Sequence, residues 1–152
     1  FDPGADPLGA GYNVLQSKVA IGSGGVLGKG FTKGTQTRLN FIPAQWTDFI
    51  YTVPGEEFGL LGATVVLTLL MIILFRGVMI ASAVKNSYGS FLAIAIVGVF
   101  ATHTFMNIGM ALGLTPVVGV PLPFLSYGGS SLLASMVMVG LLLNLYAHRK
   151  EY

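Results

Sequence analysis

One carboxylate in the sequence stands in surroundings that suit acid–base chemistry. Asp48 lies within the segment 41–51, where most of its neighbours are apolar or aromatic. A carboxylate removed from water holds a proton more readily than one in water, which suits a general base. The competing interpretation is structural, because aspartate caps helix N-termini and Trp46 is typical of the membrane interface. Asp48 is therefore a candidate catalytic residue, and a helix cap or an interface anchor is the alternative.

Two further carboxylates, Glu56 and Glu57, directly precede the first apolar run of the chain. Carboxylate oxygens are suitable ligands for a divalent cation, so this pair is a candidate metal site. Acids in the first turn of a helix are also stabilised by the helix dipole, which would explain both residues without any ligand. We favour the second interpretation.

A glycine-rich stretch, residues 22–30, fits a phosphate-binding P-loop only in part. Gly28-Lys29 matches the motif, but Ser23 stands in place of its first glycine and Gly30 in place of its hydroxyl residue. The pattern therefore argues against an NTPase loop. Two interpretations remain: an irregular or re-entrant loop against the membrane, and a loop whose amide groups and Lys29 approach an anionic headgroup.

His103 and Asn107 lie one helical turn apart within a long apolar run, on the same face of the predicted helix. A titratable group inside a membrane is a functional candidate by default. We favour a hydrogen bond between helices, because Gly109 and Gly113 would allow a neighbouring helix to approach closely.

Composition places the elements that carry these residues in a lipid bilayer. Of the 152 residues, 53% are hydrophobic and 9% are charged, and the mean hydropathy is +0.76. Soluble domains carry about 25% charged residues, so this chain has too few to cover a water-facing surface. The net charge of +2 argues against nucleic-acid binding, and the absence of cysteine excludes disulfides and thiolate chemistry.

Three apolar runs predict three transmembrane helices in an all-α integral membrane protein, a polytopic helical bundle. They cover about 58–75, 91–114 and 131–147, and the first is an uncharged run of about 27 Å, close to the thickness of a hydrocarbon core. The connection 115–130 contains three prolines yet stays apolar. Irregular backbone at membrane depth needs protein or a cavity around it, so this connection is expected to fold back into the bundle and line a cavity.

The part of the chain before the spans is more polar and predicts a separate region. Residues 1–57 hold nine of the fourteen charged side chains, and residues 58–152 carry the spans. Within the first region, Tyr12, Leu15 and Val19 share one helical face, which predicts a short amphipathic helix at a membrane interface. No basic leader precedes the first span, and the chain reads as a piece of a longer polypeptide.

Charges beside the spans predict the orientation of the chain in the membrane. Lysine and arginine occur in the loop 76–90 and in the tail 148–152, whereas the connection 115–130 carries no charge. Cytoplasmic loops hold an excess of these residues, which predicts that the loop and the tail are cytoplasmic. Residues 1–57 and 115–130 then share the extracytoplasmic face.

A series of motifs occurs in a fixed order along the chain and covers nearly all of it. The motifs include Gly11-Tyr12, Ala20-Ile21-Gly22-Ser23-Gly24-Gly25, Gly28-Lys29-Gly30, Thr47-Asp48-Phe49, Gly55-Glu56-Glu57, Asn107-Ile108-Gly109-Met110 and Pro121-Leu122-Pro123-Phe124-Leu125-Ser126-Tyr127-Gly128-Gly129-Ser130. Together they resemble the C-terminal part of the SEDS family, and its RodA branch more closely than its FtsW branch. The last motif is highly specific.

The resemblance implies a ten-span protein of the bacterial inner membrane. It implies a peptidoglycan glycosyltransferase that polymerises lipid II during cell elongation, with a class B penicillin-binding protein as its partner. The chain would supply most of the large extracytoplasmic loop and the last three spans, so the fragment alone is expected to be inactive. The family's essential aspartate falls on Asp48. Because undecaprenyl pyrophosphate is a good leaving group, one base suffices for an inverting attack on lipid II.

The resemblance also suggests which residues would meet the substrate. The departing pyrophosphate needs its charge balanced by basic side chains or by a divalent cation such as Mg or Mn, for which Glu56 and Glu57 are the candidate ligands. The candidate substrate-binding residues are Lys18, Lys29, Lys33, Arg38, Ser126, Tyr127, Gly128, Gly129 and Ser130. Many relatives differ at Trp46 and His103, so neither receives a mechanistic role.

Two other functions stay open on the sequence alone. An apolar bundle with a polar cavity also suits a lipid II flippase or transporter, and a membrane scaffold of the elongation machinery is a third class. A polymerase needs a base at the outer face, whereas a transporter or a scaffold should tolerate the loss of Asp48.

Overall fold

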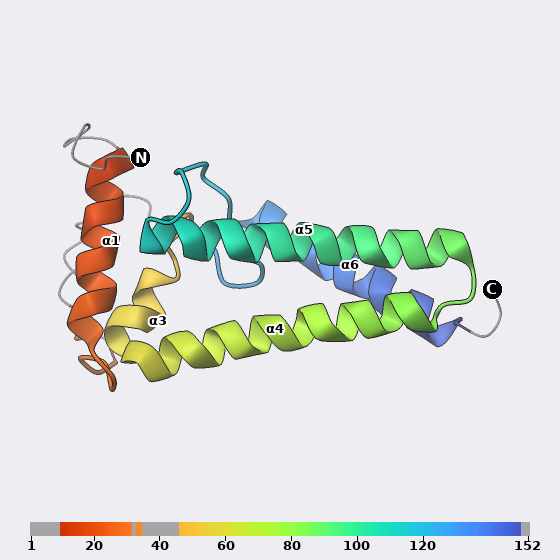
Figure 1. Ribbon diagram of the computed structural model, residues 1–152, viewed down its shortest axis with the longest axis horizontal. Helices are drawn as coiled ribbons and strands as arrows, with labels where there is room; N and C mark the ends of the chain where they lie inside the picture. The colour runs from red at the N-terminus through yellow and green to blue at the C-terminus, as the bar shows by residue number, and fades with distance from the viewer. Residues whose placement is uncertain (1–9, 32, 35–45, 150–152) are drawn as a thin grey trace.

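The computed structural model describes residues 10–31, 33–34 and 46–149 (Figure 1). Regular structure in this part of the chain is entirely helical, which confirms the predicted fold class. The helices are α1 (Ala10–Gly24), α3 (Thr52–Glu57), α4 (Gly59–Ala83), α5 (Ser87–Leu112) and α6 (Gly129–Ala147).

Three of these helices, α4, α5 and α6, are long and apolar enough to cross a membrane. The predicted number of spans is therefore confirmed, but the first span is longer than predicted. Helix α4 continues through Arg76 to Ala83, and α5 begins at Ser87 after Asn86, whose side chain accepts a hydrogen bond from the Tyr88 amide (3.0 Å). Arg76 is exposed on the helix surface, where its long stem can carry the charge toward water, so it does not end the helix.

The long helices form a bundle with the shorter helices gathered at one end. Helices α4 and α5 run antiparallel to one another, and α6 packs against both (Figure 1). Helices α1 and α3 lie at the end of the bundle where α4 begins and α5 ends (Figure 1). Helices α1 and α3, from the first of the two regions predicted to share the outer face, therefore lie at the end of the bundle where the connection 115–130 begins.

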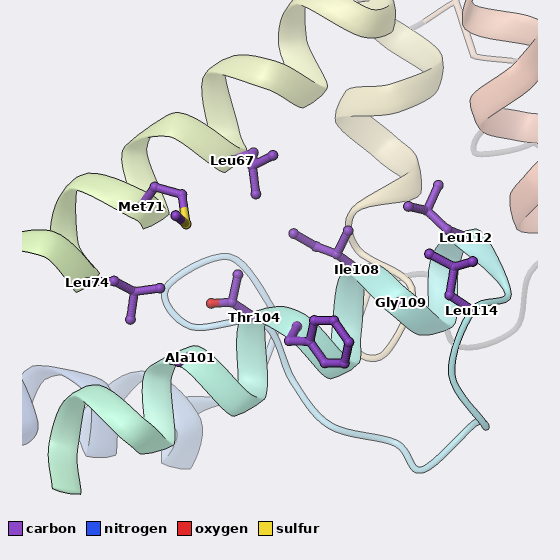
Figure 2. Close-up of a pocket in the computed structure, with 10 residues that line it drawn as sticks. Leu67, Met71, Leu74, Ala101, Thr104, Ile108, Gly109, Leu112 and Leu114 are labelled. Carbon is purple, nitrogen blue, oxygen red and sulfur yellow. The ribbon is translucent and has the colours of Figure 1, made fainter. Parts of the chain in front are cut away.

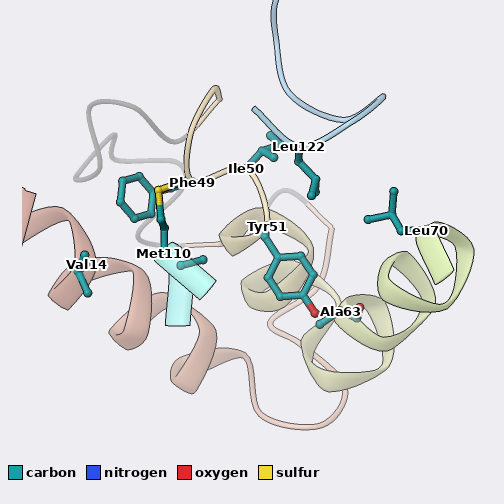
Figure 3. Packing of buried hydrophobic residues seen from close by; sticks show 9 residues of the cluster. Val14, Phe49, Ile50, Tyr51, Ala63, Leu70, Met110 and Leu122 are labelled. Atoms are coloured by element: carbon teal, nitrogen blue, oxygen red, sulfur yellow. Dashed lines mark hydrogen bonds between the residues drawn. The ribbon is translucent and has the colours of Figure 1, made fainter. Parts of the chain in front are cut away.

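A buried apolar cluster joins α1, α3, α4 and α5 at that end (Figure 3). Phe49 is 1% exposed, and full burial of an aromatic side chain contributes about 2–3 kcal/mol. Tyr51 points toward α4 in Figure 3, and its hydroxyl donates a hydrogen bond to the Ala63 carbonyl (3.1 Å). The chain segment around Asp48 is thus anchored by the side chains that follow it.

Helix α1 packs on the bundle through small residues. Val14, Ser17 and Ala20 are buried, and the Ser17 hydroxyl donates to the Ala111 carbonyl near the end of α5 (2.6 Å). Leu15 and Val19, which the sequence placed on the apolar face, are 55% and 48% exposed. The predicted helix is therefore present, but the residues that pack on the protein are not the ones that the apolar pattern selected.

The connection between α5 and α6 folds back into the bundle, as predicted. Helix α5 ends at Leu112 and is capped by Gly113, which adopts a left-handed conformation (φ 70°). Leu122 is 1% exposed, and the ring of Phe124 lies 5.7 Å from that of Phe100 between ring centres. Helix α6 consequently starts partway along the α4–α5 pair rather than at its end (Figure 1).

Candidate functional site

Asp48 lies in a turn that precedes α3. The turn covers residues 46–51, and Tyr51 is the N-cap residue of α3 with no side-chain hydrogen bond of its own to the helix. The helix-cap interpretation of Asp48 was therefore wrong. The first residue of α3, Thr52, instead donates from its hydroxyl back to the Phe49 carbonyl (2.6 Å).

Three consecutive carbonyl groups of this turn accept hydrogen bonds from residues far along the chain. The donors are the Tyr127 amide to the Trp46 carbonyl (2.8 Å), the Ser126 hydroxyl to the Thr47 carbonyl (2.6 Å) and the Asn107 amide nitrogen Nδ2 to the Asp48 carbonyl (2.9 Å). The backbone on both sides of Asp48 is thereby attached to the end of α5 and to the start of α6.

The motif 121–130 supplies two of these donors and also begins α6. Ser126 is buried, and its hydroxyl accepts from the Leu122 amide (2.7 Å) while it donates to the turn. The side chain of Tyr127 is 82% exposed, and Gly128 is the N-cap residue of α6. The motif therefore positions the Asp48 turn, and a role for its residues in substrate binding stays a prediction.

The carboxylate of Asp48 is half-buried and faces the backbone of Gly119. A Cβ atom added to Gly119 would lie 3.4 Å from the Asp48 Oδ2 atom, and Gly119 has a φ of 70°, which glycine adopts readily. Within the described parts of the chain, the carboxylate of Asp48 makes no hydrogen bond or ion pair. It is therefore available to accept a proton.

The glycine-rich turn after α1 packs on the junction between α3 and α4. The amides of Lys29 and Gly30 donate to the Glu56 and Glu57 carbonyls at the end of α3 (3.1 and 3.0 Å). Two carbonyls of the same turn, those of Gly25 and Val26, accept from the amides of Leu60 and Leu61 in the first turn of α4 (2.9 and 3.3 Å). One turn thus caps two helix ends, which otherwise leave backbone groups without partners.

Close backbone contacts explain why this turn is rich in glycine. A Cβ atom on Gly28 would collide with the Glu57 carbonyl, and one on Gly59 would collide with the Gly28 amide. Both glycines also have positive φ angles, 78° and 64°. Because the amides of residues 28–30 all donate to main-chain carbonyls, they do not form a free nest for an anionic headgroup.

Lys29 and Glu56 form an ion pair beneath this turn. The Lys29 Nζ atom lies 3.0 Å from Glu56 Oε1, and the Glu56 side chain is fully buried whereas that of Lys29 is 28% exposed. Glu56 and Glu57 close α3 instead of opening a helix, so the prediction that they lie in a first helical turn was wrong. The break comes from Gly59, whose left-handed backbone starts α4 in a new direction.

The other basic candidates lie in different places. Lys18 extends along Gly113 at the C-terminal end of α5, where the helix dipole favours a cation. Lys33 is exposed, and Arg38 lies outside the described residues. Among the described residues, no group of three His, Cys, Asp or Glu side chains could hold a metal ion.

His103 and Asn107 differ in what they contact. His103 lines a cavity of about 60 Å³ together with Pro121, Pro123, Ser131 and other residues of α5 and α6, in agreement with the predicted cavity beside the connection. Asn107 is fully buried and donates to two carbonyls outside any helix, so the predicted interhelical hydrogen bond was wrong for this residue. A buried amide in an apolar helix needs polar partners. The irregular connection that follows α5 was the sequence feature that could have indicated where Asn107 finds them.

A larger cavity of about 220 Å³ lies between α4 and α5 (Figure 2). Apolar side chains line nearly all of it, including Leu67, Met71 and Leu74 from α4 and Ile108 from α5. It holds no charged or titratable group and offers no catalytic chemistry.

Comparisons with known proteins agree with this architecture. The profile of the FtsW, RodA and SpoVE family, described as "Cell cycle protein", matches residues 1–151. The chain is 47% identical over 150 residues to the peptidoglycan glycosyltransferase MrdB of Escherichia coli K12. This match covers 99% of this chain and 40% of that protein. It is 41% identical over 149 residues to the peptidoglycan glycosyltransferase RodA of Treponema pallidum, covering 98% of this chain and 34% of that protein.

A solved structure gives the same result for the fold. It is described as "Structural coordination of polymerization and crosslinking by a peptidoglycan synthase complex", and one of its chains matches with a TM-score of 0.79 and 30% identity. That match covers 99% of this chain and 40% of the other. The chain thus spans between about a third and two fifths of the length of these relatives, and it is a multi-pass membrane protein that belongs to the FtsW, RodA and SpoVE family, also called SEDS.

Proposed function

We propose that this chain carries the general base of a RodA-type peptidoglycan glycosyltransferase, which polymerises lipid II into glycan strands in the bacterial inner membrane. One observation carries the proposal. The Asp48 carboxylate has no partner among the described residues, yet the backbone that presents it is fixed by three hydrogen bonds. A side chain that only stabilised the fold would be expected to use its charge in a local contact. Two relatives named as peptidoglycan glycosyltransferases support the reaction class.

The reaction needs one proton acceptor. Asp48 takes the proton from the 4-hydroxyl group of the acceptor GlcNAc, and the hydroxyl oxygen attacks C1 of the donor MurNAc. The bond from C1 to the pyrophosphate oxygen breaks with inversion, and undecaprenyl pyrophosphate leaves with the electron pair. Because this leaving group needs no proton, a second carboxylate is not required, unlike in glycoside hydrolysis.

The charge on the departing pyrophosphate must be balanced. The described residues do not fit a site for Mg or Mn, since Glu56 is engaged by Lys29 and no group of three candidate ligands is present among them. We therefore assign no step to a cation held by this part of the chain. Of the described basic candidates, Lys18 and Lys33 are exposed and could meet an anionic group, whereas Lys29 is paired with Glu56.

The proposal includes an orientation and a partner. Residues 1–57 and 115–130 face the outside of the cytoplasmic membrane, and residues 76–90 and 148–152 face the cytoplasm. The gathering of α1, α3 and the end of α5 at one end of the bundle supports this arrangement (Figure 1). A class B penicillin-binding protein is the proposed partner, supported by the similarity to a chain of a peptidoglycan synthase complex.

The test is lipid II polymerisation by the full-length protein in complex with its penicillin-binding partner. Asp48→Asn keeps the shape of the side chain but removes its basicity, and we expect it to lower the rate of glycan synthesis by at least about 100-fold, the usual contribution of a general base. Ser82→Ala, a change at the other end of α4, is the control and should leave the rate unchanged.

Undiminished glycan synthesis by folded Asp48→Asn and Asp48→Ala proteins would refute the assignment of the base. If the wild-type protein instead moved lipid II across vesicle membranes and both Asp48 variants kept that activity, the transporter alternative would replace the polymerase. A scaffold would show neither activity and would keep cell shape as long as the partner still binds.

A further inference from the structure

Asn107 is the buried polar residue whose contacts reach the Asp48 turn from inside the bundle. Its side chain is 0% exposed, and its Nδ2 atom lies 2.9 Å from the Asp48 carbonyl oxygen and 2.8 Å from that of Val120. Both neighbours are carbonyl oxygens, which only accept hydrogen bonds, so both N–H groups of the amide are used. A single side chain therefore joins the Asp48 turn to the connection between α5 and α6.

Ser126 makes the matching contact one peptide earlier. Its hydroxyl donates to the Thr47 carbonyl (2.6 Å), and the same oxygen accepts from the Leu122 amide (2.7 Å). The hydroxyl group is thus fully used in joining the turn to the connection. Ser126 is 7% exposed, so a ligand has little access to its hydroxyl group, whereas the contact with the turn is already made.

These two contacts fix the direction in which the Asp48 side chain leaves the backbone. The Thr47 carbonyl belongs to the peptide plane before the Asp48 Cα atom, and the Asp48 carbonyl belongs to the plane after it. Because peptide groups are planar, fixing both planes fixes φ and ψ of Asp48 and with them the direction of the Cα–Cβ bond. The contact of Asn107 with the Val120 carbonyl holds the neighbouring connection in place. In that connection, Gly119 faces the Asp48 carboxylate.

We propose that Asn107 and Ser126 are positioning residues for Asp48, which together hold its carboxylate at the reacting hydroxyl group. This inference rests on the proposed function of Asp48. It assigns Ser126 to the geometry of the base instead of to substrate binding. Loss of either contact removes one of the hydrogen bonds that hold the peptide planes beside Asp48, and a displacement of about 1 Å in a reacting group can lower a rate by about 100-fold.

The test uses the full-length protein with its penicillin-binding partner and measures kcat and KM for lipid II polymerisation per folded complex. Asn107→Asp keeps the shape but turns acceptor oxygens toward two carbonyls, and we expect kcat to fall by about 100-fold with KM changed less than about threefold. Ser126→Ala removes one hydrogen bond, and we expect kcat to fall by about fivefold.

Ser90→Ala is the matched control. Its hydroxyl also donates to a main-chain carbonyl, that of Ala81 (2.8 Å), but at the opposite end of α5. It should leave kcat unchanged. The acid limb of the pH–rate profile is a second readout, because a displaced carboxylate has new surroundings, and we expect this limb to move in Ser126→Ala and not in Ser90→Ala.

The outcomes separate the two proposals. If Asp48→Asn polymerises lipid II normally, the base assignment fails and this inference fails with it. If Asp48→Asn is inactive while folded Asn107→Asp or Ser126→Ala keeps the kcat and acid limb of the wild type, the inference alone is overturned. Should Asn107→Asp fail to fold, Ser126→Ala decides the matter, because it deletes only one oxygen atom. A loss of kcat in Ser90→Ala equal to that in Ser126→Ala would also overturn the inference.

Discussion

At the scale of single residues, Tyr51 shows how the Asp48 turn is attached to the first span. Its hydroxyl lies inside the apolar cluster and donates to the Ala63 carbonyl of α4 (3.1 Å). Burial raises the pKa of Tyr51 above its ordinary value of 10.0, because the charged phenolate is poorly solvated there. The neutral form, which can donate the hydrogen bond, is therefore the form that the fold favours.

Replacing this tyrosine tests the contact and its pH dependence together. Tyr51→Phe should lower the free energy of unfolding by about 1 kcal/mol at neutral pH, the usual contribution of one hydrogen bond. Because the pKa is raised in the fold, the contribution of Tyr51 is complete below pH 10 and is lost as the pH rises through the folded-state pKa. Thermal unfolding in detergent at several pH values should show the difference between the two proteins shrinking above pH 10. A constant difference at high pH would contradict this account.

At the scale of elements, the junction between α3 and α4 depends on the turn that covers it. Glu56 lies in the last turn of α3, where the helix dipole disfavours a negative charge, and Lys29 compensates for it. The ion pair therefore supports a connection that the backbone hydrogen bonds of the glycine-rich turn also close.

The ion pair gives a prediction for stability. Lys29→Met removes a cation from a buried carboxylate, and we expect a loss of about 1–3 kcal/mol, less than for a fully buried pair because Lys29 is partly exposed. Lys33→Met, a change of an exposed lysine in the same region, is the matched control and should have little effect. The measurement is the thermal unfolding midpoint in detergent. Equal midpoints for both variants and the wild type would show that the pair does not stabilise the junction.

The elements were largely predictable from the sequence, and their contacts were not. Long apolar runs identify α4, α5 and α6, because a helix that crosses a bilayer needs about 20 consecutive apolar residues. Such runs are uncommon outside membranes. The end of α4 was missed because Arg76 was taken as a boundary, although a long side chain on a helix surface is tolerated. The break at Gly59 was missed because a left-handed glycine leaves no periodic signal.

The candidate base could be selected from the sequence, whereas the contacts that support it could not. Asp48 stands out by its apolar surroundings and by the family resemblance, and its role as the base stays a prediction. The contacts of Asn107 and Ser126 with main-chain carbonyls depend on how distant segments meet, which local patterns do not contain. For the same reason the sequence left open a contact of Lys29 with an anionic headgroup and gave no sign of its ion pair with Glu56.

At the scale of the whole molecule, the bundle has two ends of different character. One end carries α1, α3 and the Asp48 turn, and the other carries the short α4–α5 connection and the end of α6 (Figure 1). Because each span crosses the membrane, the two ends of the bundle face opposite sides of it. The proposed chemistry requires the first end to lie outside the cytoplasm.

The absence of cysteine from this chain makes the orientation testable. Ser23→Cys places a thiol at the exposed end of α1, and Lys85→Cys places one in the α4–α5 connection. A maleimide that does not cross membranes should label the first variant in intact spheroplasts and the second only after permeabilisation. Labelling of Lys85→Cys in intact spheroplasts, above the level of the parent protein, would reverse the proposed topology.

The three hydrogen bonds to the Asp48 turn also determine when, during protein synthesis, this turn can adopt its final structure. The Thr47 carbonyl receives its donor from a residue 79 positions later, and the Asp48 carbonyl from one 59 positions later. When the turn leaves the ribosome, neither donor has yet been made. Asp48 consequently reaches its final position only after the connection to α6 has been translated and inserted, so a nascent chain stalled before that point carries Asp48 but lacks the contacts that hold it in place.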